Sequence, residues 1–209
     1  MKPPAMNSTT SRKADCYSVG ERKAMVWTQQ VRGRWLMPLL KVLAACQITP
    51  DHLTLLSLAC GLAFCPLYFF QYLPAAFAAL VLHILLDGLD GPLARHTGVA
   101  SRKGSFADSM SDQTVIVATT ITLMISHTID VAAGGTYIFL YTVVVLFAMI
   151  RNALEIPYSW LVRPRFIVYA WLLVEAYWWT GSLDFVLWGF NGLLAIKLLT
   201  GFVHIRRRI

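Results

Sequence analysis

Four aspartates have the types and spacing to do chemistry. Asp87 and Asp90 are three residues apart, and Asp108 and Asp112 are four residues apart. On a helix, residues at either spacing project from one face, so each pair would present two carboxylates to a common point. Oxygen ligands of this kind suit Mg²⁺ and Mn²⁺. Two such cations would balance the four negative charges and could also bind phosphate oxygens, so we expect a site for two divalent cations, Mg²⁺ or Mn²⁺.

The aspartates belong to a chain that is unusually apolar. Of its 209 residues, 57% are hydrophobic and 14% are charged, whereas a soluble domain has about 45–50% apolar and about 25% charged residues. This composition excludes a water-soluble monomer and, for most of the chain, intrinsic disorder. It indicates a membrane protein, in which the net charge of +7 reflects topology, and we expect no nucleic-acid partner.

Six apolar stretches are candidates to cross the bilayer, which takes about 20 helical residues for about 30 Å of hydrocarbon. One aspartate pair falls near the end of the second stretch, and the other falls near the start of the third. Adjacent antiparallel spans would bring both pairs to one side of the membrane. The predicted spans are His52–Phe70, Pro74–Ala94, Gly104–Ser126, Thr136–Asn152, Phe166–Thr180 and Phe185–Val203.

The lysines and arginines define an orientation. They precede the first span, occupy the connections between spans two and three and between four and five, or lie in and after the sixth span. The other three connections contain none. By the positive-inside rule, both termini and the aspartates face the cytoplasm. We therefore expect a multi-pass integral membrane protein, in a bacterial cytoplasmic membrane, with its active site on the cytoplasmic side.

Three segments follow one another along the chain. Residues 1–20 are polar and predict a flexible cytoplasmic tail. Residues 21–48 mix basic and apolar side chains, which predicts an amphipathic juxtamembrane helix in the membrane interface. Residues 49–209 form the six-span domain, and Thr49-Pro50-Asp51 is typical of a helix start because Thr49 can cap and Pro50 suits the first helical position. The expected fold is all-α, with six transmembrane helices after an N-terminal amphipathic interfacial helix.

A longer motif surrounds the aspartates and resembles that of a known family. It reads Asp87-x2-Asp90-Gly91-x2-Ala94-Arg95-x8-Gly104-x3-Asp108-x3-Asp112. It is similar at all eight defining positions, with the same spacing, to the signature of the CDP-alcohol phosphotransferases, also called CDP-alcohol phosphatidyltransferases. The six-span layout and the sequence Thr49-Pro50-Asp51…Thr54 also resemble this family.

The resemblance implies a reaction and roles for residues. The family transfers a substituted phosphate from a CDP-linked alcohol, often CDP-diacylglycerol, to a small polar acceptor alcohol and releases CMP, in phospholipid biosynthesis. It implies that the four aspartates hold two divalent metals, that Asp112 is the general base on the acceptor hydroxyl, and that the chain forms a homodimer. The residues expected to border the nucleotide are Gly91, Ala94, Arg95, Gly104, Asp51 and Thr54.

The acceptor stays open at this point. Glycerol phosphate, an inositol phosphate, inositol, serine and an amino alcohol are all candidates, although Thr54–Phe64 lacks the arginine that we associate with glycerophosphate acceptors. Basic residues on the side of the site are candidates to bind a phosphorylated acceptor. For the arginines the alternative is topological anchoring, and for the lysine it is snorkelling. These residues are Arg151, Arg163, Arg165 and Lys197.

Two other functions compete with this interpretation. An ion or proton transporter would carry acidic residues at several depths, but here four lie at one end and only Asp130 and Asp184 lie opposite. A catalytically silent relative that binds a CDP-lipid would be favoured by loss of a signature aspartate, and none is lost. We expect Glu175 and His83 to be hydrogen-bonded packing groups rather than site residues.

Overall fold

The computed structural model describes residues 35–153 and 164–207. These residues form helices joined by short connections, and they contain no strand, which confirms an all-α fold for the described part of the chain. A helix over Trp35–Ala45 comes first. It is followed by α2 (Pro50–Phe69), α3 (Leu73–His96), α4 (Arg102–Ile125), α5 (Val131–Ala153), α6 (Pro164–Tyr177) and α7 (Ser182–Arg206).

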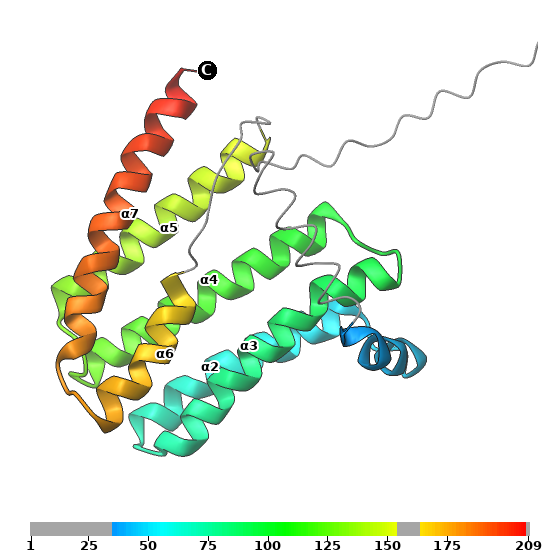
Figure 1. The fold of residues 1–209 in the computed structure, drawn as a ribbon, viewed down its shortest axis with the longest axis horizontal. Helices are drawn as coiled ribbons and strands as arrows, with labels where there is room; N and C mark the ends of the chain where they lie inside the picture. Colours follow the sequence, from blue (N-terminus) through cyan, green and yellow to red (C-terminus); the bar gives the residue numbers. More distant parts are fainter. Residues whose placement is uncertain (1–34, 154–163, 208–209) are drawn as a thin grey trace, which may run out of the picture.

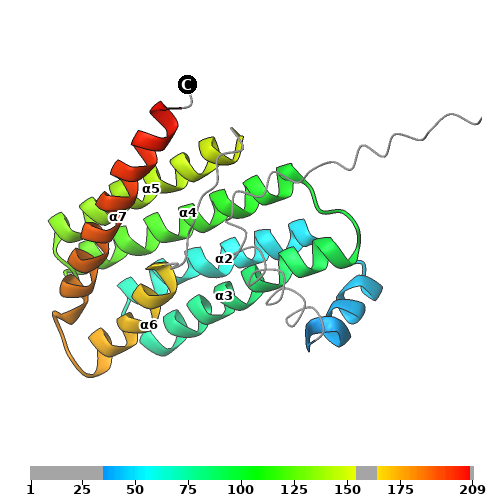
Figure 2. The ribbon, with the colours of Figure 1, turned by 45° about the horizontal axis from the view of Figure 1, so that its top comes forward.

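The helices form a bundle with two distinct ends (Figures 1 and 2). Helix α2 packs against α3 and α4, α5 packs against α4 and α7, and α6 packs against α7. The connection from α3 to α4 lies at one end, which we call the site end, whereas the connections α2–α3, α4–α5 and α6–α7 lie at the other (Figure 1). The last turns of α3 and the first turns of α4 are therefore neighbours.

Close approach of three helices depends on a glycine in α2. A Cβ at buried Gly61 would lie 2.5 and 2.7 Å from the two Cγ atoms of Val115 in α4, and 3.2 Å from Nδ1 of His83 in α3. Only a residue without a side chain fits at such distances. His83 itself is buried, and its Nδ1 lies 2.8 Å from the hydroxyl of Ser57. This confirms the expectation of a hydrogen-bonded core histidine.

Polar caps fix the helix starts on either side of the site. The Thr49 hydroxyl accepts a hydrogen bond from the backbone N–H of His52, and Nδ1 of His52 accepts one from the N–H of Thr49. This capping box confirms the predicted start of α2. At the start of α4, the Ser101 hydroxyl accepts a bond of 3.0 Å from the N–H of Gly104.

Helix α5 starts earlier than the predicted span Thr136–Asn152. A carboxylate oxygen of Asp130 accepts hydrogen bonds from the backbone N–H groups of Ala132 and Ala133. An acidic cap of this kind satisfies N–H groups that have no partner inside the helix. The helix therefore begins at Val131, and the predicted boundary was five residues too late.

A buried carboxylate joins α6 to α7. Glu175 is 3% exposed and accepts hydrogen bonds from the N–H groups of Gly181 and Leu183 and from the hydroxyl of Ser182. Its charge lies at the N-terminus of α7, where the helix dipole stabilises an anion. Glu175 is thus the packed, hydrogen-bonded group that the sequence predicts.

Within the described residues, four helices are long and apolar enough to cross a membrane, namely α2, α3, α5 and α7. Helix α4 has 24 residues, or about 36 Å at 1.5 Å per residue, but its first half is too polar for that set. Helix α6 has 14 residues, or about 21 Å, which is shorter than a bilayer core of about 30 Å. The count of six spans stays a prediction.

The helix over Trp35–Ala45 docks on the site end of the bundle through Leu40, with Leu36 and Leu43 packed beside it. Leu40 is buried and packs with Leu53 of α2 and Leu93 of α3. Trp35 and Val42 are exposed, so the helix has one packed face and further apolar surface. The part of the predicted juxtamembrane helix before residue 35 lies outside the described residues.

Candidate active site

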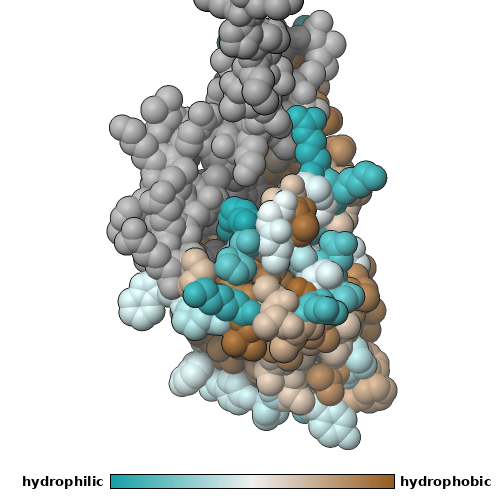
Figure 3. Space-filling model, turned by 90° about the vertical axis from the view of Figure 1, so that its right-hand side faces the viewer, coloured by the Kyte–Doolittle hydropathy of each residue, from teal (hydrophilic) through white to brown (hydrophobic). Residues whose placement is uncertain are grey.

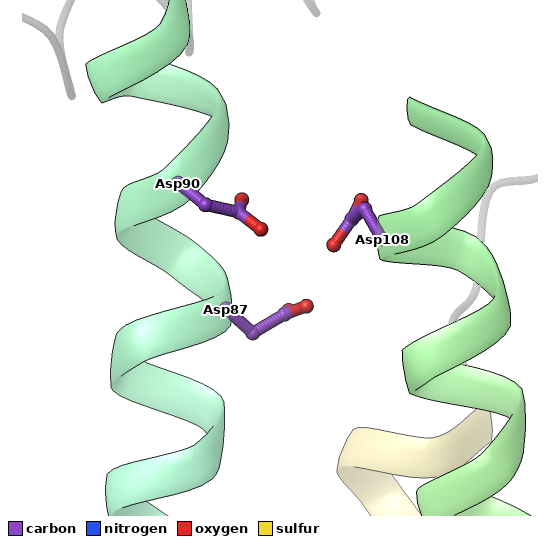
Figure 4. Close-up of side chains that lie close together, drawn as sticks. All are labelled: Asp87, Asp90 and Asp108. Carbon is purple, nitrogen blue, oxygen red and sulfur yellow. The ribbon is translucent and has the colours of Figure 1, made fainter. Parts of the chain in front are cut away.

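Three carboxylates from two helices meet at the site end of the bundle. Asp87 and Asp90 belong to the last part of α3 and Asp108 to the first part of α4, and one oxygen of each lies within 4.8 Å of the others. Figure 4 shows the three side chains pointing toward one another across the gap between the helices. The convergence that the spacing predicts is therefore present for these three of the four aspartates. We call these three residues the aspartate cluster.

Asp90 is held on both of its carboxylate oxygens. The hydroxyl of Thr54 in α2 donates to Oδ2 at 2.8 Å, and the backbone N–H of Gly91 donates to Oδ1. Asp90 is 7% exposed, so these bonds orient a nearly buried ligand group. Thr54 was predicted to border the nucleotide. That nucleotide contact stays a prediction, and the structure adds a hydrogen bond from the Thr54 hydroxyl to one of the aspartates, which the sequence did not predict.

Arg165 connects the first and last aspartates of the motif. Its Nη2 lies 2.8 Å from Oδ2 of Asp87, and its Nη1 forms an ion pair with Oδ1 of Asp112. The Arg165 side chain is 4% exposed, and those of Asp87 and Asp112 are 11% and 20% exposed. The guanidinium therefore brings Asp112 into contact with the site. The only sign of this in the sequence is a basic residue at the start of a helix on the side of the site.

The charge and donor atoms of the site fit a divalent cation. The Arg165 guanidinium pairs with two of the four carboxylates, so these five side chains alone carry a net charge of about −3 when ionised. Like charges at such short range repel, and a cation would relieve the repulsion. Within the described residues, the group that could hold a metal consists of carboxylates alone. Hard oxygen donors favour Mg²⁺ or Mn²⁺ over zinc, as the sequence predicts, whereas the number of ions stays a prediction.

The remaining residues predicted to border a nucleotide lie on the same helix ends. A Cβ at Gly91 would lie 3.3 Å from Nη1 of Arg95, so the Arg95 guanidinium lies over this glycine beside Asp90. Ala94 is half-buried in the last turns of α3, and Gly104 lies in the first turn of α4. Asp51 is exposed in the first turn of α2. Their nucleotide contacts stay a prediction.

The basic residues proposed for the acceptor lie on different elements. Arg151 is buried in the last turn of α5, and Lys197 is half-buried in α7. Arg163 lies outside the described residues. Figure 3 faces the site end of the bundle and shows hydrophilic side chains gathered there among hydrophobic ones. Arg165, another of the predicted acceptor contacts, pairs with two of the aspartates.

The fold and the site together define a class of protein. Apolar helices of bilayer length carry, at the end of the bundle, a cluster of carboxylates suited to divalent cations, so this is a multi-pass membrane protein with a candidate metal site. The family model described as CDP-alcohol phosphatidyltransferase matches residues 47–203, a range that includes all four aspartates. The chain belongs to the CDP-alcohol phosphatidyltransferase family.

Individual relatives differ in the acceptor that their names give. The CDP-diacylglycerol–serine O-phosphatidyltransferase of Mycobacterium leprae is 34% identical over 110 residues, which are 52% of this chain and 37% of the relative. The archaetidylinositol phosphate synthase of Pyrococcus horikoshii is 38% identical over 73 residues, which are 35% of this chain and 39% of the relative. The chain thus covers well under two thirds of the length of these curated relatives.

Solved structures share the fold. A crystal structure of the Mycobacterium tuberculosis phosphatidylinositol phosphate synthase with CDP-DAG bound has a TM-score of 0.70 and 21% identity, and the match covers 81% of this chain and 92% of that chain. A structure of the same protein with manganese and citrate has a TM-score of 0.68 and 21% identity, over 79% of this chain and 86% of that chain. At this identity the likeness shows a common fold.

Proposed function

We propose that this protein transfers a substituted phosphate group from a CDP-alcohol, such as CDP-diacylglycerol, to a small acceptor alcohol and releases CMP. The observation that carries the proposal is the aspartate cluster, in which motif residues from α3 and α4 lie within 4.8 Å of one another. Family membership supports the reaction type. The bound CDP-DAG and manganese in solved structures of a protein with this fold support the donor and the cation.

The residues of the site have complementary roles in this proposal. Asp87, Asp90, Asp108 and Asp112 hold two divalent cations, Mg²⁺ or Mn²⁺. When bound, these cations neutralise the diphosphate and stabilise the leaving CMP. Thr54 fixes the orientation of Asp90, because its hydroxyl donates to that carboxylate.

Asp112 acts as the general base. It takes the proton from the acceptor hydroxyl. The acceptor oxygen then forms a bond to the phosphorus that carries the alcohol group of the donor. The bond from that phosphorus to the bridging oxygen breaks, and CMP leaves with this oxygen.

The placement of charges and aromatic rings supports an orientation in the membrane. Arg95, Arg102 and Lys103 are exposed at the site end, whereas Trp178 and Trp179 are exposed at the opposite end. Exposed cations are what the positive-inside rule expects at a cytoplasmic interface, and exposed tryptophans are typical of either interface. We propose six spans with both termini and the site on the cytoplasmic side, after a tail (residues 1–20) and an interfacial helix (residues 21–48). A lipid donor would then keep its acyl chains in the bilayer while a polar acceptor arrives from water.

Nucleotide and acceptor contacts complete the proposal. The cytidine nucleotide would lie beside Asp90, bordered by Gly91, Ala94, Arg95, Gly104 and Asp51. Serine and an inositol phosphate are both candidate acceptors, because relatives named for each class are similar to this chain. An inositol phosphate would need cations for its phosphate group, a role open to Arg151, Arg163 and Lys197. A homodimer is proposed from the family resemblance.

The test is an acceptor panel with purified protein, CDP-diacylglycerol and Mn²⁺ or Mg²⁺. CMP release should require one acceptor among serine, inositol phosphate, glycerol phosphate, inositol and an amino alcohol. Asp112→Asn should abolish release and leave the protein folded. Asp184→Asn is the matched control, because Asp184 lies at the opposite end and an asparagine oxygen can still accept its hydrogen bond from the Asp130 N–H.

Three outcomes would refute parts of the proposal. Full activity in Asp112→Asn would remove Asp112 as the base. Binding of Mn²⁺ and CDP-diacylglycerol without CMP release for any acceptor would favour a catalytically silent relative. Proton or ion flux in vesicles without CMP release would favour a transporter. Against a transporter, the carboxylates of Asp130 and Asp184 both accept hydrogen bonds from backbone N–H groups at the start of α5.

A further inference from the structure

Arg165 divides the four aspartates into two groups. The aspartate cluster has its oxygens within 4.8 Å of one another, while Asp112 forms an ion pair with the Arg165 guanidinium. Asp87 belongs to both groups, because Nη2 of Arg165 lies 2.8 Å from its Oδ2. One side chain from α6 therefore contacts the carboxylates at the two ends of the motif, on α3 and α4.

We propose that Arg165 is a positioning residue that holds Asp112 against Asp87 and competes with a divalent cation for these two carboxylates. This inference rests on the proposed function and adds to it a role for a residue outside the motif. The sequence pointed to Arg165 only as one of several basic residues that could bind an acceptor.

The chemistry of the contact favours positioning. A guanidinium presents its donors in a planar fork, which can contact two carboxylates at once, whereas a lysine ammonium is a compact point charge. The ring centroid of Phe166 lies 4.7 Å from Cζ of Arg165, within range for a cation–π contact that also restrains the group. Asp112 Oδ1 and Arg165 Nη1, which pair with each other, are both shielded from solvent. Such a buried pair is costly to break from one side.

Competition follows from charge. The guanidinium is a positive charge paired with both Asp87 and Asp112, so it reduces the repulsion between these carboxylates. A divalent cation at the same carboxylates would be repelled by the guanidinium at short range. Because coupling between two binding events is reciprocal, a bound cation should weaken the Arg165 contact by the same factor by which that contact weakens cation binding. Removing the contact should therefore strengthen cation binding.

The experiment is a Mn²⁺ titration followed by electron paramagnetic resonance, with no CDP-alcohol present. It compares the wild type with Arg165→Gln, Arg165→Lys and Arg102→Gln. Arg102 is exposed at the start of α4, so its variant removes the same charge without touching the ion pairs of Arg165. We expect the Kd for Mn²⁺ to fall about tenfold or more in Arg165→Gln, to an intermediate value in Arg165→Lys, and to stay within about twofold in Arg102→Gln. The metal-free Arg165→Gln protein should also unfold at a lower temperature than the wild type.

Activity measurements separate positioning from acceptor binding. A positioning role predicts that Arg165→Lys lowers kcat at saturating acceptor and leaves KM for the acceptor nearly unchanged, because the substitution displaces the base and does not alter the groups that bind the acceptor. A raised KM with an unchanged kcat would assign Arg165 to the acceptor and overturn the inference.

The metal titration gives the other decisive results. An equal Kd for Mn²⁺ in the wild type and in every folded Arg165 variant would overturn competition. If Arg165→Gln does not fold, Arg165→Lys decides alone, and a wild-type Kd in that variant refutes the inference. If the wild type itself binds no Mn²⁺, the metal site of the proposed function fails together with this inference. If Mn²⁺ binding follows the expectation but no acceptor yields CMP, the reaction is refuted and the competition stands.

Discussion

Replacing Thr54 with valine should weaken metal binding without removing any metal ligand. The Thr54 hydroxyl donates to Oδ2 of Asp90 at 2.8 Å, and valine keeps the branched shape but loses the donor. A hydrogen bond to a charged group contributes about 1.5–3 kcal/mol. Because about 1.4 kcal/mol corresponds to a factor of ten, loss of this hydrogen bond could weaken metal binding through Asp90 by about 10- to 150-fold. The Gly91 N–H still holds Oδ1, so we expect a loss near tenfold.

The assay measures CMP release as a function of Mn²⁺ concentration, together with direct Mn²⁺ binding. In Thr54→Val the half-saturating Mn²⁺ concentration should rise about tenfold, within the range of 10–100-fold that is typical for partners of metal ligands. The maximal rate at saturating Mn²⁺ should change less. Thr54→Ser keeps the hydroxyl and should resemble the wild type. Thr114→Val removes a hydroxyl whose described bond is to Met110 O of its own helix, and it should also leave the Mn²⁺ dependence unchanged.

A wild-type Mn²⁺ dependence in Thr54→Val would refute the reasoning. If that variant instead raised KM for CDP-diacylglycerol with unaltered Mn²⁺ affinity, Thr54 would act on the nucleotide, as the family resemblance implies, rather than through Asp90.

Three further predictions concern packing, a buried carboxylate and metal removal. Gly61→Ala should lower the free energy of unfolding by about 1–3 kcal/mol because its Cβ would overlap Val115. Gly189→Ala is the control, because Gly189 is exposed with open space around it, and its free energy of unfolding should not fall. Equal thermal unfolding midpoints of the two variants in detergent would contradict this prediction. Glu175→Gln should cost about 2 kcal/mol or more, since an amide replaces a carboxylate that accepts three hydrogen bonds, and an unchanged midpoint would show that the charge is dispensable. Chelation with EDTA should abolish CMP release, excess Mg²⁺ or Mn²⁺ should restore it, and full activity after chelation would exclude metal dependence.

The convergence of the aspartates was predictable because it depends on local geometry. Spacings of three and four residues place two carboxylates on one helix face. The connection between α3 and α4 is only five residues, 97–101, so the ends of the two helices must be close. The cap at Thr49 was predictable for the same reason, because Thr49 bonds to the first turn of the helix that it precedes. The cap at Glu175 was predictable only in part. The partners of Glu175 come from the next helix, and the sequence indicates only that such a buried group needs partners.

The contacts of Arg165 and Thr54 were not predictable in this way. Arg165 is 78 residues from Asp87 along the chain, and its place depends on how α6 packs in the bundle. Nothing local to Arg165 distinguishes a cation that binds a phosphate from one that pairs with carboxylates, because both require only a positive charge near the site. Thr54 is similarly 36 residues from Asp90, and a half-buried threonine on an apolar helix has many possible partners.

Helix α4 shows why hydropathy and function conflict in this fold. Its first half carries Asp108 and Asp112, and α4 is not among the described helices that are apolar enough to cross a membrane. Its second half is apolar, and Val115, Ile116 and Leu123 are buried there. A helix that presents carboxylates at the end of a bundle has less apolar surface at that end. The described helices of bilayer length that are apolar enough to cross a membrane include α2, α3 and α5. The aspartates that belong to the family motif are therefore also residues that make the first half of α4 polar, and whether α4 crosses the membrane stays a prediction. Ionisable residues in an apolar bundle of this kind are evidence of a functional site.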